Sequence, residues 1–254
     1  MGDMMTRCQV WLGTFVEVTT HRDDAIEAAF GAIATVHALM NRHDRASEVS
    51  AINGLAIGEA ITVHDWTAQV LARALFWSRM SDGAFDPTLT GDWRCVDLSG
   101  RDVRLRRPVT IDLGGIAKGF AVDCAIAAMQ AAGATAGLVN AGGDMRGYGP
   151  SPWSAVLVDP TTRIAVATAS IDNCALATSA VRPSGDFSHL PARRAGTTSA
   201  TVQCPHAIDA DALTKIVLSG SARTQECLAT AKACALTIDA GGRISGVLPL
   251  DRAA

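Results

Sequence analysis

One stretch of the chain, residues 111–123, combines the residue types that bind a phosphate group. It reads as the end of a strand, then the pair Gly114 and Gly115, then a helix with Lys118 in its first turn. Such a junction directs backbone N–H groups, the positive end of a helix and a cation toward one point. The stretch therefore predicts a site for a phosphorylated ligand, with Asp112 placed to accept a hydrogen bond from a ribose or an adenine.

The glycine pair has a second interpretation that needs no ligand. Paired glycines at a strand-to-helix turn often serve only the close packing of the backbone. The chain also contains neither the G-x-G-x-x-G spacing of dinucleotide-binding folds nor the G-x-x-x-x-G-K-[ST] spacing of a Walker loop. A functional interpretation of this stretch therefore depends on other segments.

The composition indicates a protein with a substantial hydrophobic core and argues against several classes of protein. Of 254 residues, 48% are hydrophobic, which is enough for a substantial core, and the net charge of -3 gives no electrostatic case for binding nucleic acid. No apolar run approaches the ~20 residues that cross a bilayer. The seven cysteines are scattered without a C-x-x-C pair, so neither a zinc ribbon nor a redox pair is predicted. Thiols of this kind and the lack of a basic-then-apolar leader favour a cytoplasmic location.

Helical and strand patterns together predict an α+β fold. Apolar residues at helical spacing predict helices over residues 23–41, 65–81, 115–132, 209–218 and 224–233. Alternating or β-branched runs predict strands over residues 9–19, 103–111, 138–140, 154–158, 164–171, 175–178, 199–203, 235–239 and 244–248. We expect one domain over residues 1–254, with helices packed on mostly antiparallel sheets. His37, on the apolar face of the first helix, is expected to be a core histidine.

Five further segments carry residues that could contact a ligand, although each has a purely structural interpretation. Ser47 and Ser50 suit a turn and a helix cap, Asp86 before a proline suits a turn, and Asp211 suits the first turn of a helix. The segments lie at residues 11–14, 47–53, 83–88, 140–144 and 210–215.

In this order and spacing, the six segments resemble the ApbE family, the FAD:protein FMN transferases. The motifs read L-G-T, S-E-V-S-A-I-N, G-A-F-D-P-T, D-L-G-G-I-A-K-G, N-A-G-G-D and A-D-A-L-T-K, and they extend over most of the chain. The resemblance implies an ApbE-like fold in two closely packed lobes. It also implies transfer of FMN from FAD to a Ser or Thr hydroxyl of an acceptor flavoprotein, with release of AMP and assistance from Mg²⁺.

The resemblance assigns six residues to the binding of FAD. These are Leu12 beside the flavin, Ala84, Phe85 and Asp86 in the loop around the nucleotide part, and Asp112 and Lys118 at the glycine junction.

The resemblance also assigns metal ligands and catalytic residues. The backbone carbonyl of Gly115, the carboxylate of Asp211 and the position of Thr214 match the ligands of the metal, so Asp211 is expected to be needed for catalysis. His189 is a candidate general base for the acceptor hydroxyl, since an imidazole titrates near neutral pH. A loop histidine that only packs is the alternative.

Two departures from the family pattern lie near the expected metal. Lys215 stands where the family has a threonine, and its ammonium could repel a cation, replace one of its charges or extend away from it. The segment 189–196 keeps its histidine and glycine but carries Ala192, Arg193 and Ala195 in place of Asp, Pro and Thr. These departures leave open an FAD-binding protein without catalysis, and a metal-dependent FAD pyrophosphatase on the same scaffold is a further alternative.

Overall fold

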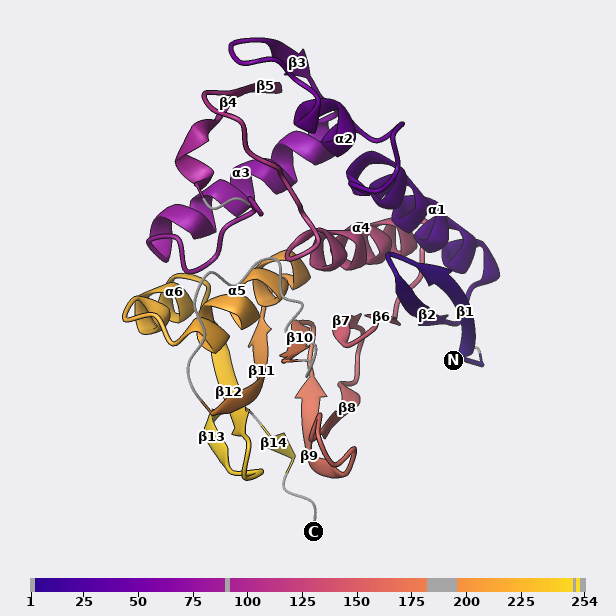
Figure 1. Ribbon diagram of the computed structural model, residues 1–254. Helices are drawn as coiled ribbons and strands as arrows, with labels where there is room; N and C mark the ends of the chain where they lie inside the picture. The colour runs from indigo at the N-terminus through magenta and orange to yellow at the C-terminus, as the bar shows by residue number, and fades with distance from the viewer. Residues whose placement is uncertain (1–2, 90–91, 182–195, 249, 252–254) are drawn as a thin grey trace.

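An eight-stranded antiparallel sheet forms one layer of the protein, and helices cover one of its faces (Figure 1). The structure is a computed structural model that describes residues 3–89, 92–181, 196–248 and 250–251. In order across the large sheet, the strands are β1 (Met5–Trp11), β2 (Thr14–Thr20), β6 (Gly137–Ala141), β7 (Asp144–Tyr148), β10 (Ala175–Ala180), β11 (Thr197–Cys204), β12 (Cys234–Asp239) and β13 (Ile244–Val247).

Two small antiparallel sheets extend the fold at opposite ends. One is built from β14 (Leu250–Asp251), β9 (Ala165–Ile171) and β8 (Trp153–Val158), and the other from β3 (Ala60–Thr62), β5 (Asp102–Leu105) and β4 (Val96–Ser99). The helices are α1 (Asp23–Met40), α2 (Glu48–Asn53), α3 (Asp65–Met80), the 3-10 helix η1 (Trp93–Cys95), α4 (Ala117–Ala131), α5 (Ala207–Ser219) and α6 (Thr224–Thr230).

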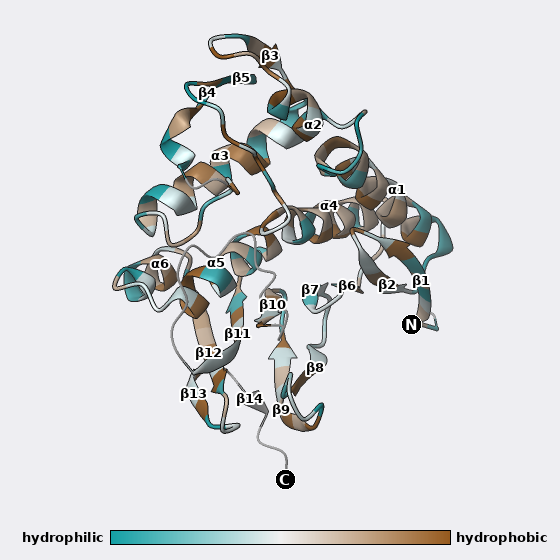
Figure 2. Cartoon of the chain, viewed as in Figure 1, coloured by the Kyte–Doolittle hydropathy of each residue, from teal (hydrophilic) through white to brown (hydrophobic). Residues whose placement is uncertain are grey.

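Helix α5 lies at the centre of the molecule, between the large sheet and the other helices. It contacts β10 and β11 on one side and α3 and α4 on the other. Eleven of its 13 residues are buried, as expected for a helix enclosed on all sides. Figure 2 shows polar residues on this helix among the apolar ones. Polar side chains held in such a position need partners inside the protein.

One of these buried polar residues, Asp209, is satisfied by α3. Its carboxylate accepts hydrogen bonds from the Arg73 guanidinium at 2.5 and 2.7 Å and from the Trp77 indole at 2.8 Å. Asp209 thus joins α5 to α3, and the buried polar residues that follow it on α5 are Asp211, Thr214 and Lys215.

Two glycine-containing hairpin turns bring the ends of four strands together. Leu12 and Gly13 join β1 to β2 with φ values of 55° and 73°, and Gly142 and Gly143 join β6 to β7 with φ values of 62° and 100°. Two consecutive positive φ angles are typical of the tight turns that suit twisted antiparallel strands. The single strand expected over residues 9–19 is therefore wrong, because this turn divides it into a hairpin.

The predicted helices correspond closely to the observed ones, whereas some short elements differ. Residues 48–53 form α2 rather than a turn, although the expected cap is present, since the Ser47 hydroxyl accepts the Ser50 N–H at 3.1 Å. The strand expected over residues 103–111 ends at Leu105, and only Ile111 pairs again, in an isolated bridge with Thr88. Strands β3, β4, β7 and β14 were not predicted.

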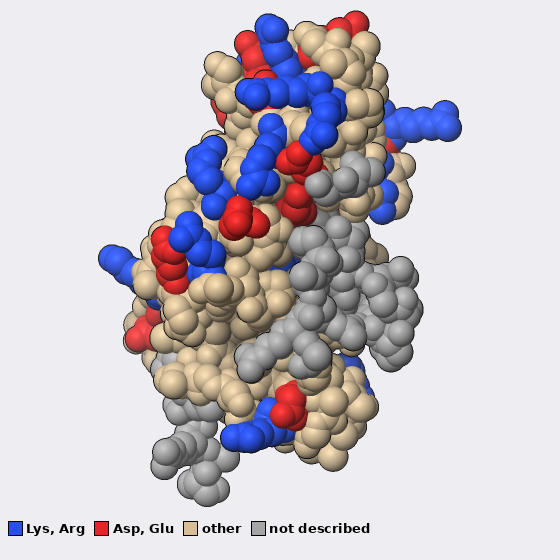
Figure 3. All heavy atoms as spheres, turned by 60° about the vertical axis from the view of Figure 1, so that its left-hand side comes forward, with Lys and Arg blue, Asp and Glu red and all other residues tan. Residues whose placement is uncertain are grey.

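The exposed charges on the face over α3, η1 and the small sheet of β3, β4 and β5 are mixed in sign. Figure 3 shows Lys and Arg side chains on this face beside Asp and Glu side chains. Four ion pairs account for much of this pattern, namely Arg94–Asp82, Arg101–Asp65, Arg106–Asp97 and Arg107–Asp92. Among the described residues, no helix has the length and hydropathy needed to span a membrane.

Candidate functional site

A cavity of about 1010 Å³ opens where the β1–β2 turn, the end of α1, the start of α4, strand β10 and α5 meet. This volume lies at the upper end of the range for small-molecule sites. Four cationic side chains line the cavity, Arg42, Lys118, Arg163 and Lys215, against the carboxylate of Asp112. The cavity therefore suits a large anionic ligand such as a dinucleotide.

Lys118 lies at the first turn of α4 and is held by two buried carboxylates. Its ammonium forms an ion pair with Asp144 on β7 and lies 4.0 Å from Oδ2 of Asp211 on α5. Both aspartates are fully buried. The second oxygen of Asp144 is buried without a hydrogen-bond partner among the described residues. Lys118 thus presents a fixed positive charge to the cavity.

Lys215 lies four residues after Asp211 on α5 and folds back onto it. Its ammonium pairs with Oδ1 of Asp211 and donates a hydrogen bond to the Asp211 backbone carbonyl at 2.9 Å. The other carboxylate oxygen of Asp211 accepts the backbone N–H of Gly119 at 3.1 Å. Lys215 is 5% exposed, and it is the residue through which α5 lines the cavity.

Burial and neighbouring charges move the pKa values of this cluster apart. Burial, together with the nearby charge of Asp211, raises the pKa of Asp144 to about 6, in spite of its ion pair with Lys118. Burial would also raise the pKa of Asp211, but Lys118 and Lys215 outweigh it and lower that pKa. Burial alone would lower the pKa of Lys118, but Asp144 and Asp211 outweigh it and raise that pKa. At neutral pH, Asp211 is therefore an anion and Lys118 a cation.

Many backbone N–H groups of the glycine junction before α4 donate hydrogen bonds to other groups of the protein. The N–H of Gly114 bonds to the Asp112 carboxylate at 2.8 Å, and the N–H groups of Ile116 and Ala117 bond to the Leu113 carbonyl at 3.0 and 2.8 Å. The N–H of Gly119 donates a hydrogen bond to the Asp211 carboxylate. The positive charge offered to a ligand here therefore comes mainly from the Lys118 side chain, rather than from a row of backbone amides as the sequence suggested.

Arg42 was not predicted, although it is part of the same wall. Its guanidinium forms an ion pair with Asp112 at 2.8 Å, and both residues line the cavity. Arg163 reaches the cavity from the β8–β9 loop. His37, expected in the core, is half-buried, lines the cavity and packs edge-on against Trp11 at a centroid distance of 5.7 Å. In the sequence, the only local indication that Arg42 could contact a ligand is the polar run of residues 41–45, directly after α1.

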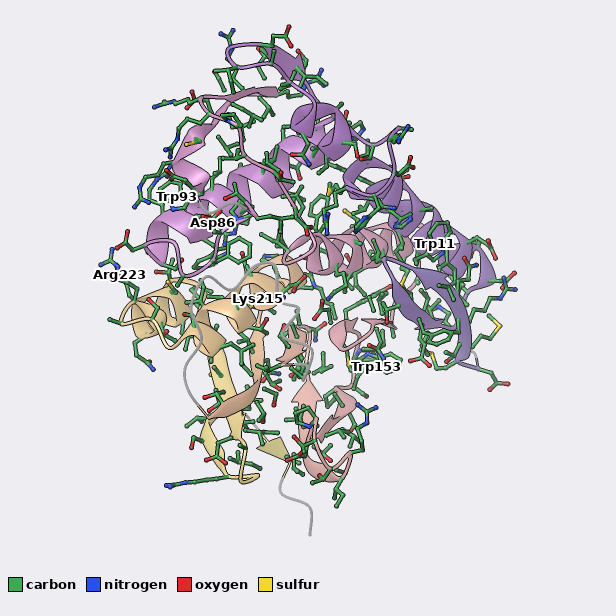
Figure 4. All side chains as sticks on the ribbon, in the orientation of Figure 1. Trp11, Asp86, Trp93, Trp153, Lys215 and Arg223 are labelled. Atoms are coloured by element: carbon green, nitrogen blue, oxygen red, sulfur yellow. The ribbon has the colours of Figure 1, made fainter. Side chains whose placement is uncertain are left out.

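The residues expected to bind FAD occupy two places. Leu12, Asp112 and Lys118 line the cavity. Ala84, Phe85 and Asp86 follow α3 and are not among the described residues that line the cavity, and Figure 4 shows Asp86 beside Trp93. Their loop adjoins the cavity wall, because the Asp112 N–H bonds to the Pro87 carbonyl at 2.8 Å.

The loop of Asp86 is organised by its own hydrogen bonds. The Asp86 carboxylate accepts bonds from the N–H and hydroxyl of Thr88 at 2.8 and 2.7 Å and from the N–H of Trp93 at 3.2 Å. Phe85 is fully buried. In this arrangement Asp86 shapes the turn, and a role in FAD binding stays a prediction.

The residues expected to bind a metal do not present a free ligand set in the structure. Both carboxylate oxygens of Asp211 are engaged, and the Thr214 hydroxyl bonds to the Asp211 carbonyl at 2.7 Å and to the Ser179 hydroxyl at 2.7 Å. Gly115 is buried. The Lys215 ammonium occupies Oδ1 of Asp211, so a divalent ion bound to this carboxylate would have to displace it. His189 and residues 192–195 lie outside the described residues.

The comparison with known families decides the classification. The ApbE family model matches residues 12–238, which is most of the chain. The chain belongs to the ApbE family. A curated FAD:protein FMN transferase from Rhodobacter capsulatus is 29% identical over 188 residues, which make up 58% of this chain and 36% of that protein. The chain thus spans little more than a third of the length of this curated relative.

Solved structures of other ApbE proteins have the same fold. The ApbE protein from Thermotoga maritima is 24% identical, with a TM-score of 0.85 over 96% of this chain and 97% of that one. The flavin transferase ApbE from Vibrio cholerae is 18% identical, with a TM-score of 0.84 over 98% of this chain and 97% of that one. The ApbE-like α+β architecture expected from the sequence is therefore confirmed.

Proposed function

We propose that this ApbE-family chain transfers the FMN part of FAD to a Ser or Thr hydroxyl of an acceptor flavoprotein and releases AMP. Family membership and the curated relative support this reaction. The observation that carries it is the pair of ammonium groups, Lys118 and Lys215, which meet at Asp211 and both line a cavity large enough for a dinucleotide. An ammonium group has three N–H donors, so both lysines can also donate hydrogen bonds to the oxygens of a diphosphate bridge.

In the proposed reaction, the acceptor hydroxyl oxygen forms a bond to the phosphorus of FMN. The bond from that phosphorus to the bridging oxygen breaks, and its electron pair leaves with AMP. The hydroxyl proton passes to a base, for which His189 is our candidate. Negative charge grows on the phosphate oxygens and the leaving group, and fixed cations stabilise it without having to reorient.

Different residues of the cavity are proposed to contact different parts of FAD. Lys118 is fixed by Asp144 and Asp211, so it can neutralise the diphosphate without first being ordered. Arg42 and Arg163 also line the cavity and add positive charge for a nucleotide. Leu12 supplies apolar surface at the β1–β2 turn, as a flavin ring requires. Contacts of Ala84, Phe85 and Asp86 with the nucleotide, metal binding by Gly115, Asp211 and Thr214, and a cytoplasmic location remain predictions.

The test is to incubate the purified chain with FAD and a flavoprotein that carries a Ser or Thr acceptor segment. We expect the intact mass of the acceptor to rise by one FMN and AMP to appear in equal amount. Lys118→Met should remove both products. Lys232→Asn, which removes an exposed lysine just after α6 that does not line the cavity, should leave them unchanged.

The same experiment separates the alternatives. Release of AMP and FMN without a labelled acceptor would identify an FAD pyrophosphatase. Binding of FAD with neither product would identify a binding protein. Either result would contradict the proposed transfer.

A further inference from the structure

The position of Lys215 disagrees with the metal site that the family resemblance led us to expect. Asp211 is the one carboxylate among the three expected ligands, and the Lys215 ammonium pairs directly with its Oδ1 atom. The same ammonium is hydrogen-bonded to the Asp211 carbonyl, so it is held by two oxygens of one residue. A metal ion at Asp211 would have to displace this buried ammonium.

The surroundings of Asp211 leave little room for added positive charge. Lys118 lies 4.0 Å from its Oδ2 atom, and that atom also accepts the Gly119 N–H. Asp144 pairs with Lys118, so the described cluster contains two ammonium groups and two carboxylates. Charge balance inside a buried cluster stabilises it, whereas two further charges without new carboxylates would destabilise it.

Lys215 also has a donor left for a ligand. An ammonium group has three N–H donors, and within the part of the chain that the structure describes its hydrogen bonds go to Asp211 alone. Because Lys215 lines the cavity, the remaining donor is available to a phosphate oxygen. A divalent ion bound to Asp211 would make the same contact through its charge.

We propose that the Lys215 ammonium takes the place of a divalent cation in this chain, so that the diphosphate of the nucleotide binds without metal. The proposal deepens the proposed function, since it concerns the same nucleotide site. It makes a further claim, however. It predicts that the nucleotide-free protein does not bind a divalent metal ion at Asp211, whether or not the protein transfers FMN.

The first measurement uses the unmodified protein. FAD is titrated calorimetrically into the chain in excess EDTA and again in excess Mg²⁺. We expect the two dissociation constants to agree within about twofold, or about 0.4 kcal/mol. In parallel, Mn²⁺ is titrated into the chain and followed by its electron paramagnetic resonance signal. We expect the signal of free Mn²⁺ to be undiminished by the protein.

The second measurement restores the residue expected at this position. Lys215→Thr frees the Asp211 carboxylate, so this variant should gain a Mn²⁺ site in the absence of any nucleotide. Lys215→Thr combined with Asp211→Asn should lose that site again. In EDTA, FAD should bind to Lys215→Thr about tenfold more weakly, because one charge-assisted hydrogen bond is lost. Mg²⁺ should recover much of the lost affinity. Lys215→Arg, which keeps the charge, should bind FAD without metal, and Lys232→Asn controls for the loss of a positive charge elsewhere.

The outcomes are distinct from those of the proposed function. FAD affinity that depends on Mg²⁺ in the unmodified chain, or tight Mn²⁺ binding by it, would overturn the proposal, as would a folded Lys215→Thr variant without a Mn²⁺ site. If circular dichroism shows that Lys215→Thr does not fold, the two measurements on the unmodified chain decide. If FAD does not bind under any condition, the proposed function fails, while the Mn²⁺ titrations still decide the role of Lys215.

Discussion

Gly119 on α4 lies directly against the backbone of Ala207 at the start of α5. A Cβ atom added to Gly119 would overlap the carbonyl group of Ala207 and lie 2.8 Å from the amide nitrogen of Ile208. Asp123, one turn further along α4, caps the same end of α5 by accepting the N–H groups of Ala207 and Ile208 at 3.0 and 2.9 Å. This close approach lets Lys118 and Asp211 reach each other.

The first prediction concerns Gly119. We expect Gly119→Ala to lower the free energy of unfolding by about 3 kcal/mol, because the new methyl group meets rigid backbone and forces the two helices apart. It should also weaken FAD binding, since the Gly119 N–H fixes Asp211. Urea denaturation and calorimetry measure the two effects.

Gly31→Ala is the matched control for this substitution. Gly31 also lies within a helix, but nothing stands within 4 Å of its added Cβ. The control should raise the free energy of unfolding by about 0.5–1 kcal/mol through helix propensity. Equal effects of the two substitutions would contradict the close approach of α4 and α5.

The second prediction concerns pH and Asp144. The folded-state pKa of about 6 exceeds the ~4 of an unfolded aspartate, so protonation favours the fold. The stability contributed by Asp144 is fully present below about pH 4 and is lost as the pH rises through 6. Between these limits, the unmodified protein should lose about 2–3 kcal/mol of unfolding free energy relative to Asp144→Asn, at ~1.4 kcal/mol per pKa unit.

Carbon-13 NMR of the aspartate side chains tests the same point without a substitution. The Asp144 carboxyl should titrate with a midpoint near 6, as an exposed aspartate does not. An Asp144 midpoint below 4, or parallel stability curves for the two proteins, would show that the ion pair with Lys118 dominates over burial.

The third prediction concerns Arg163, which lines the cavity at a φ of 63°. Asparagine tolerates this backbone conformation, so Arg163→Asn should keep the stability of the protein. Removal of one cation from the cavity should weaken FAD binding about three- to tenfold at low salt, and less at high salt, where charges are screened. Lys232→Asn, at a φ of 52°, removes a cation from the same kind of conformation and should not change FAD affinity.

The fourth prediction concerns Asn53, the last residue of the segment 47–53, whose side chain holds the backbone of Ile111 just before Asp112. Its amide accepts the Ile111 N–H at 2.7 Å and donates to the Ile111 carbonyl at 2.9 Å. Asn53→Ala leaves both backbone groups without this partner and should cost about 2 kcal/mol of unfolding free energy. Asn53→Asp keeps an acceptor for the N–H and should cost less at low pH than at neutral pH. A loss below about 0.5 kcal/mol for the alanine variant would contradict this role.

The helices were predicted well because their apolar residues repeat at a regular spacing. The predicted ranges 23–41 and 65–81 end within one residue of α1 and α3. Strand β7 and helix α2 are short, and their patterns are too brief to separate from turns. Strand β7 is also fixed by its pairing with the distant strand β10, which one stretch of sequence does not reveal.

The site was predictable where its residues form local motifs. Asp112 and Lys118 were found from the glycine junction, and both line the cavity. Arg42 and Arg163 were missed, because only the folded chain brings the end of α1 and the β8–β9 loop to the same wall. The ion pair of Asp211 and Lys215 has a sequence signal, since residues four apart lie on one face of a helix.

The enclosure of α5 bears on how the protein unfolds. Separation of the large sheet from the helices would expose both sides of a helix whose residues are almost all buried, and would strip Asp211 and Lys215 of the surroundings that balance their charges. We therefore expect the two layers to melt in one cooperative transition, without a populated intermediate in which the sheet survives alone. Heating should then abolish nucleotide binding and secondary structure at the same temperature.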